Sequence, residues 1–370
     1  MSEPKYPVER IPFPVGGAPL FFRRGCKNRD GAPVLFLHGA SASCDTFLEP
    51  KGSSIFDFLN KHHGMDVWLL DWRGSHFVTA CAPGPCNEPG DTVAAQDIPE
   101  ALNFIRKTRK DEGQRDAPVA VVAHCLGAAC LSMAIGAGHV KACSGLGPVA
   151  LVAVGLFYEV TWDGWTKLQD RTLDRLADQD DTIKFITPDL KGGTWPDMME
   201  KTYDMWPKVW GPPPLWRADD FFLRLAFMFG QPFLVSNLHP SMTQDVVRKQ
   251  FGAIPFKLYR HATQNALRGF AAPFGAEGHL DPSTPNETIP NKLAETYLHL
   301  EAFKDLKITL ITGAENPLWH RESIDRMAEW LARRGRPATK HVLDGYGHQD
   351  LWWGKRSWDD VFPLVLEAVG

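Results

Sequence analysis

A short apolar segment that breaks into small residues constrains this chain most. Residues Val119 to Cys130 read VAVVAHCLGAAC, which predicts a buried strand followed at once by a helix. A nucleophile at such a turn has a strained backbone, and the residues two before and two after it must be small. Ala123 and Gly127 meet this requirement around Cys125. The pattern predicts that Cys125 is a nucleophile, and a buried structural cysteine is the alternative.

The same turn predicts where a negatively charged oxygen would be held. The first amides of the following helix, beginning with the N–H of Leu126, should point toward the space above the sulfur. Upstream, residues 33–37 read PVLFL, a predicted strand, and the loop His38-Gly39-Ala40-Ser41 follows it. We assign the N–H of Ala40 as the second oxyanion donor.

Two later strands are each followed by a polar residue that could complete the site. Residues 307–312 (KITLIT) lead to Asn316, and residues 340–344 (KHVLD) lead to His348 in a Gly-Tyr-Gly-His turn. Because ligands bind at the carboxyl edge of an open α/β sheet, Cys125, Asn316 and His348 should converge there. Their order along the chain is nucleophile, orienting residue, histidine.

An asparagine in the orienting position changes the expected chemistry. Asn316 could orient an imidazole, but its amide cannot stabilise imidazolium by charge. A thiol tolerates this, because cysteine and histidine can rest as a thiolate–imidazolium pair, as in Cys-His-Asn sites. Two alternatives stay open: Asn316 is only a turn residue, or a carboxylate does the orienting. The candidate carboxylates are Glu315, Asp344 and Asp163.

Five segments carry a family resemblance: VWLLDWRGS (67–75), VAHCLGA (122–128), MFGQPF (228–233), GAENP (313–317) and GYGHQD (345–350). The chain resembles the α/β-hydrolases, and more narrowly the cysteine-nucleophile hydrolases found beside or fused to cholesterol-oxidase-like (GMC-type) oxidoreductases. Its elbow is also similar to that of polyhydroxyalkanoate synthases. The resemblance implies an α/β-hydrolase fold, a mostly parallel sheet flanked by helices, and acyl chemistry on Cys125. The chain departs from the subgroup at Gly74 and at most positions of the central insertion.

The central part of the chain loses the strand–helix alternation. We expect residues 1–157 and 301–370 to form the hydrolase core, and residues 158–300, rich in Trp and Pro, to form a mostly helical cap. Most cap aromatics should pack within the cap, yet some could face the cysteine in an apolar pocket. The candidate pocket residues are Ser41, His124, Trp162, Trp165, Trp206 and Trp319.

Composition excludes several other classes of protein. A net charge of −4 and a pI near 6.4 lack the excess of basic residues that is typical of nucleic-acid-binding proteins. The start has no signal-peptide pattern, and no apolar segment is long enough to span a membrane. Seven cysteines lack the spacing of a disulfide framework, which fits a reducing compartment. We therefore expect a cytoplasmic protein without metal or cofactor. The oligomeric state does not follow from the sequence.

The expected function is hydrolysis of an ester, lactone or thioester of an apolar or aromatic acid. It would proceed through a thioester acyl-enzyme on Cys125. An acyltransferase or cyclase would use the same residues with an acceptor other than water. A small-molecule-binding module without turnover is the alternative from another class. We also expect His38 to brace its loop and residues 71–74 (DWRG) to form a structural turn with an ion pair.

Overall fold

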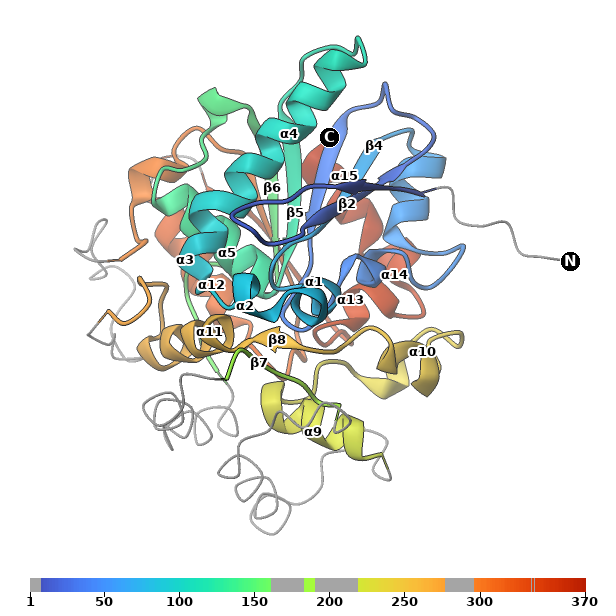
Figure 1. The fold of residues 1–370 in the computed structure, drawn as a ribbon, viewed down its shortest axis with the longest axis vertical. Coiled ribbons are helices and arrows are strands. Elements are labelled where there is room, and N and C mark those ends of the chain that lie inside the picture. The colour runs from blue at the N-terminus through green and yellow to red at the C-terminus, as the bar shows by residue number, and fades with distance from the viewer. Residues whose placement is uncertain (1–7, 161–182, 190–218, 277–295, 334, 336) are drawn as a thin grey trace, which may run out of the picture.

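The computed structural model describes residues 8–160, 183–189, 219–276 and 296–370, except 334 and 336. An eight-stranded sheet in the order β1-β2-β4-β3-β5-β6-β9-β10 forms its centre (Figure 1). The first two pairings are antiparallel and the others are parallel, so the expected mostly parallel sheet is confirmed. The strands are β1 (Val8–Pro12), β2 (Phe21–Gly25), β3 (Pro33–Leu37), β4 (Asp66–Asp71), β5 (Val119–His124), β6 (Leu146–Val152), β9 (Ile308–Gly313) and β10 (Thr339–Leu343).

Alternate residues of the central strands build two separate cores. Leu35 and Leu37 of β3 belong to one buried cluster, whereas Val34 and Phe36 belong to the other. Helices α4 (Ile98–Asp111), α5 (Leu126–Gly136) and α12 (Glu322–Ala332) contribute to the first cluster. The second receives residues from the π-helix η2 (Asp57–His62), α13 (Asp350–Trp353) and α15 (Phe362–Val369). Figure 1 shows α4 and α5 on one side of the sheet and α13, α14 (Ser357–Asp360) and α15 on the other.

Several predicted elements need correction in their bounds. Strand β3 spans residues 33–37 as predicted, and the predicted strands 307–312 and 340–344 are each displaced by one residue. The helical segment before β5 consists of three consecutive pieces. These are α3 (Gly90–Thr92), the π-helix η3 (Val93–Asp97) and α4.

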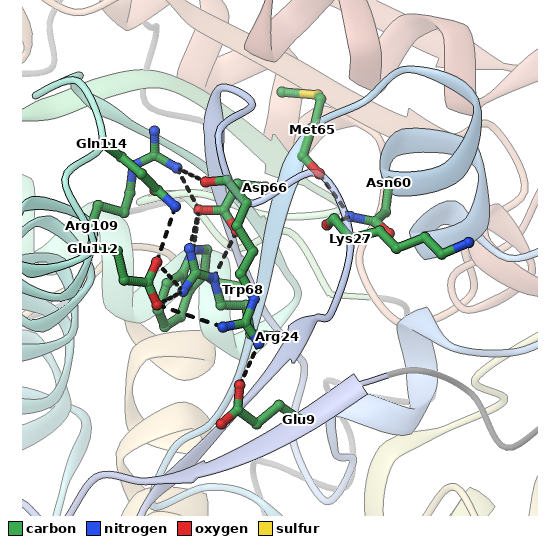
Figure 2. A network of polar contacts seen from close by, with 11 residues as sticks. Glu9, Arg24, Lys27, Asn60, Met65, Asp66, Trp68, Arg109, Glu112 and Gln114 are labelled. Atoms are coloured by element: carbon green, nitrogen blue, oxygen red, sulfur yellow. Dashed lines mark hydrogen bonds and ion pairs between the residues drawn. The ribbon is translucent and has the colours of Figure 1, made fainter.

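A buried ionic network closes the amino end of the sheet (Figure 2). The Arg24 Nε donates to Asp66 Oδ1 at 2.8 Å, and its Nη1 donates to Glu112 Oε1 at 2.7 Å. Arg109 also pairs with Asp66, and the Trp68 indole donates to the same carboxylate at 2.9 Å. The side chains of Arg24 and Asp66 are fully buried. The network joins β2, β4 and the end of α4 far from the strand ends that carry the predicted site.

Five of the described elements between β6 and β9 lie together at one end of the sheet, next to α1 (His76–Cys81) and α2 (Pro83–Cys86) (Figure 1). They are β7 (Phe185–Ile186), α9 (Asp220–Phe229), α10 (Gln244–Arg248), β8 (Ile254–Pro255) and α11 (Phe256–Arg268). β7 and β8 form a small antiparallel pair. A division into core and cap at residues 157 and 301 remains a prediction. Within the described ranges, no helix has the length and apolar character needed to cross a bilayer.

Candidate active site

Cys125 occupies a sharp turn between β5 and α5. Its φ of 54° and ψ of −126° lie outside the helical and extended regions, and such strain at a non-glycine residue is typical of functional sites. Two backbone hydrogen bonds hold it: its N–H donates to Val152 O at 2.9 Å, and its carbonyl accepts from the Ala129 N–H at 3.0 Å. The strand, the turn and the helix therefore follow the order that the sequence predicts.

The small residues around Cys125 are required by close backbone approach. A Cβ added to Gly127 would lie 2.5 Å from His38 O and 2.9 Å from Leu37 O, so only glycine lets α5 pack against the loop after β3. A Cβ on Gly39 would lie 2.9 Å from the Cβ of Cys125. These contacts place the loop containing Ala40 directly against the turn at Cys125.

Three N–H groups lie near the sulfur of Cys125, and each favours the thiolate. They are the backbone N–H groups of Ala40 and Leu126 and the indole N–H of Trp319, which lies beside the sulfur without forming a hydrogen bond to any described group. Burial outweighs them and raises the pKa of the Cys125 thiol, which is 7% exposed. The two amides are the donors that the sequence assigned to the oxyanion.

His348 is buried as well, and burial alone lowers its pKa to about 3. Both shifts favour a neutral thiol beside a neutral imidazole at rest. This is the opposite of the thiolate–imidazolium pair expected from the sequence. The physical reason is desolvation, which penalises the charged form of each group when no opposite charge lies close enough to compensate.

The loop that carries His348 is anchored by a buried carboxylate. Asp350 accepts hydrogen bonds from the Gly347 N–H at 2.9 Å, the Leu234 N–H at 3.2 Å and the Asn237 side-chain amide at 2.8 Å. These bonds tie the GYGHQD segment to residues just after α9. Burial raises the pKa of Asp350, and the three hydrogen bonds act in the opposite direction. This aspartate belongs to the GYGHQD motif, but no local feature of the sequence predicts its anchoring role.

The rings of His124 and His348 lie 4.6 Å apart between centroids, at the carboxyl edge of the sheet. A Cβ on Gly39 would be 3.4 Å from His124 Nδ1 and 3.5 Å from Cys125 Sγ, so all these groups border one small region. Among the residues that the structure describes, no hydrogen bond joins His348 to Cys125 or to Asn316. The Nδ1 of His348 is buried without a partner in this part of the chain. Such bonds are often long before substrate binds.

Asn316 uses its side-chain oxygen within its own loop. Its Oδ1 accepts from the backbone N–H groups of Leu318 at 3.1 Å and Trp319 at 3.3 Å. Two N–H groups facing the same atom fix it as the oxygen, so exchanging O and N would be unfavourable. The buried Nδ2 has no partner within the described ranges. This bonding fits the turn-residue alternative, and a role toward His348 stays a prediction.

The alternative carboxylates lie elsewhere or outside the described residues. Glu315 is exposed, and its carboxylate accepts the Gly345 N–H at 2.7 Å. Asp344 is also exposed. Asp163 falls in a range that is not described. Neither described carboxylate is placed to compete with Asn316.

The candidate pocket residues differ in their surroundings. Trp319 lies beside the sulfur, whereas Ser41 is bound to the loop after α10, where the Gly252 N–H donates to Ser41 O at 2.9 Å. His124 is buried against His348 and packs edge-on against Trp352, with ring centroids 5.7 Å apart. Trp162, Trp165 and Trp206 lie outside the described residues.

Two minor expectations concern the loops behind the site. His38 Nδ1 donates to Gly39 O at 2.8 Å, which matches its expected role in bracing the loop. Arg73 of the turn after β4 forms a buried ion pair at 2.6 Å, but its partner is Asp97, which lies outside the turn. All seven cysteines are free.

Comparison with known proteins agrees with this geometry. Residues 34–363 match the Alpha/beta hydrolase family, and the chain belongs to this family. No curated protein matches the sequence significantly.

Solved structures support the same fold at low sequence identity. A lipase in its open form is 17% identical, with a TM-score of 0.57 and coverage of 98% of both chains. A thermostable carboxyl esterase from Bacillus coagulans is 13% identical, with a TM-score of 0.58, 98% of this chain and 99% of that chain covered. An esterase from Thermogutta terrifontis is 11% identical, with a TM-score of 0.50 and the same coverage.

Proposed function

We propose that this α/β-hydrolase is an acyl hydrolase that forms a thioester acyl-enzyme on Cys125. The observation that carries the proposal is the strained turn at Cys125, with the sulfur beside the amides of Ala40 and Leu126. A purely structural cysteine has no need of this backbone conformation. The lipase and esterases of similar fold act on esters by their names, which agrees with the proposal.

The reaction starts from the neutral pair. As the Cys125 sulfur bonds to the carbonyl carbon of an ester, lactone or thioester, its proton passes to His348. The oxyanion accepts hydrogen bonds from Ala40 and Leu126, and each such donor is worth about 3 kcal/mol in comparable enzymes. The protonated His348 gives its proton to the leaving alcohol or thiol as the carbon–oxygen or carbon–sulfur bond breaks.

Water completes the cycle. His348 takes a proton from a water molecule whose oxygen attacks the thioester carbon. The carbon–sulfur bond then breaks, the acid leaves and Cys125 regains its proton. The imidazolium forms only during each step, so burial of His348 raises the barrier unless the oxyanion compensates its charge. Asn316 fixes the loop beside this site and, in our proposal, orients His348.

Intact-protein mass spectrometry with a panel of aryl and alkyl esters of apolar acids tests the proposal. We expect a mass increase equal to the acyl group, located on Cys125 and absent in Cys125→Ala. His348→Gln should slow both formation and loss of the adduct. Turnover that survives in Cys125→Ala would contradict the nucleophile assignment. Absence of any adduct and any turnover would favour a binding module.

Burial of the site favours one second candidate, an acyltransferase. Cys125 is 7% exposed and His348 is 2% exposed, so water reaches the thioester poorly in this state. The same mass-spectrometry experiment, repeated with added alcohols and amines, separates the two activities. An adduct that water clears slowly and an acceptor clears quickly would replace hydrolysis by transfer.

A further inference from the structure

Two buried polar atoms next to Cys125 have no hydrogen-bond partner in the described part of the chain. They are the hydroxyl of Tyr158 and the indole nitrogen of Trp319. Tyr158 is 4% exposed, and its ring meets the Trp319 ring edge-on, with centroids 5.5 Å apart and an angle of 68°. Trp319 lies beside the Cys125 sulfur, so the pair extends outward from the reacting atom.

An unpartnered buried hydroxyl is costly and therefore needs an explanation. The other tyrosines in the described ranges show what this protein does elsewhere. The hydroxyl of Tyr259 donates to Met228 O, that of Tyr297 to Asp91, and that of Tyr346 to Asp360 at 3.0 Å. Tyr158 departs from this rule, and Cys125 is among the groups that act on it.

The backbone at both residues is fixed by hydrogen bonds, and their rings pack against each other. The Tyr158 N–H donates to Gly269 O at 3.0 Å, and the Trp319 N–H donates to Asn316 Oδ1 at 3.3 Å. An antiparallel bridge also joins Trp319 to Val160, two residues after Tyr158. The two polar atoms are therefore preorganised on one side of the sulfur.

The chemistry of the pair defines its ligand. An indole N–H only donates, and a tyrosine hydroxyl donates or accepts, so an oxygen acceptor satisfies both. Among the described residues, the thiols of Cys130 and Cys125 act electrostatically on Tyr158, and no described cation does. A carboxylate would lack a counter-charge in this buried place, so a neutral oxygen fits better.

We infer that Tyr158 and Trp319 form a second polar contact, which binds a neutral keto or ether oxygen of the substrate close to the carbonyl that Cys125 attacks. The two amides hold the carbonyl oxygen, and this pair holds the second oxygen. The inference rests on the proposed acyl-hydrolase function and deepens it: the substrates are acyl compounds with a second oxygen beside an otherwise apolar skeleton. That oxygen lies either in the acyl chain or in the leaving alcohol.

Two pairs of esters test whether the second oxygen belongs to the acyl chain or to the leaving alcohol. The first pair is 4-nitrophenyl 4-oxopentanoate and 4-nitrophenyl pentanoate. The second is 2-methoxyethyl hexanoate and butyl hexanoate. The kcat/KM of each ester is divided by its uncatalysed hydrolysis rate. We expect the oxygenated ester to be favoured about tenfold in one pair, and the pair identifies the side that carries the oxygen.

Variants connect the preference to the two side chains. Tyr158→Phe should reduce the tenfold ratio to near one, and Trp319→Phe provides a second test if the first variant does not fold. Tyr346→Phe is the matched control, because it removes a hydroxyl that bonds to Asp360 in the other core, and it should keep the wild-type ratio. A ratio near one for both pairs in the wild type, or an unchanged ratio in both site variants, would overturn this inference alone. Loss of all Cys125 acyl adducts would overturn it together with the proposed function.

Discussion

Replacing Gly127 by alanine tests whether the close packing at the turn of Cys125 is essential for stability and activity. The added Cβ would lie 2.5 Å from His38 O and 2.9 Å from Leu37 O. Both atoms belong to the backbone, so neither can rotate away as a flexible side chain would. Helix α5 or the loop after β3 must move by about 0.9 Å to bring the shorter distance to an ordinary contact of 3.4 Å.

The size of the effect follows from this displacement. Overpacking a tight site costs about 1–3 kcal/mol, so the free energy of unfolding should fall by that amount. The same movement separates the Ala40 amide from the Leu126 amide. Loss of one oxyanion donor costs about 100-fold to 1000-fold, and a displaced donor should cost less. We expect kcat/KM to fall about tenfold to 100-fold.

Chemical denaturation and steady-state kinetics on an active ester measure the two effects. Gly84→Ala is the matched control, because a Cβ there meets no atom within 4 Å and Gly84 lies in the short helix α2. Its stability should change by less than about 1 kcal/mol, and its kcat/KM should not change. Equal behaviour of the two variants would refute the packing argument.

Three further predictions concern charge and protonation. Because burial raises the pKa of Cys125 above the usual value, the thiolate should be less than about 3% of the population at pH 7. Its alkylation by iodoacetamide, followed by peptide mass spectrometry, should accelerate as the pH rises; rapid labelling at pH 5 would contradict the neutral pair. Asp350→Asn should lower the free energy of unfolding by about 1–3 kcal/mol and reduce kcat, because one backbone N–H loses its acceptor. The control Asp344→Asn, at an exposed site, should change neither quantity. In urea denaturation, Arg24→Gln should lower the free energy of unfolding by about 3 kcal/mol, because the buried carboxylate of Asp66 loses part of its counter-charge. Arg106→Gln, which breaks an exposed ion pair, should lower it by less than about 1 kcal/mol. Similar losses in the two variants would show that burial does not control the difference.

Burial of His348 gives a separate pH prediction. Its pKa of about 3 lies below the ordinary value near 6.5, so the folded state favours the neutral ring. The stability contributed by this group is therefore lost as the pH falls from about 6.5 toward 3. If protonation of His348 limits activity, the acid arm of the kcat/KM profile should lie near pH 3–4. An arm near pH 6.5 would show that the ring is better solvated in the free enzyme.

The central strands could be predicted because their residues are apolar on both faces. Strands β3 and β5 are buried throughout, and continuous apolar runs are typical of parallel strands covered by helices. Strand β2 was missed because it contains Arg23 and Arg24. Arg24 is buried only because Asp66, Glu112 and the Trp68 ring surround it, and these partners come from distant parts of the sequence.

Only those residues of the candidate site that belong to a local sequence motif could be predicted. The turn at Cys125 has a local cause, because small residues permit one backbone to approach another. Asp350 and Tyr158 have no comparable local signal: the first depends on partners from residues 234 and 237, and the second on its position beside Trp319. The protonation states of Cys125 and His348 could not be predicted from the sequence either, because they depend on how deeply the two side chains are buried.

The contact between Gly252 and Ser41 has a mechanical consequence. Ser41 directly follows Ala40, whose amide faces the sulfur, and Ser41 has a φ of 58° that few side-chain-bearing residues tolerate. Any motion that admits substrate by drawing residue 252 away would pull on this strained link. Entry of the substrate would then be coupled to the position of the Ala40 amide. While residue 252 is displaced, this amide would be out of place, so water that enters at that moment would not be activated for attack.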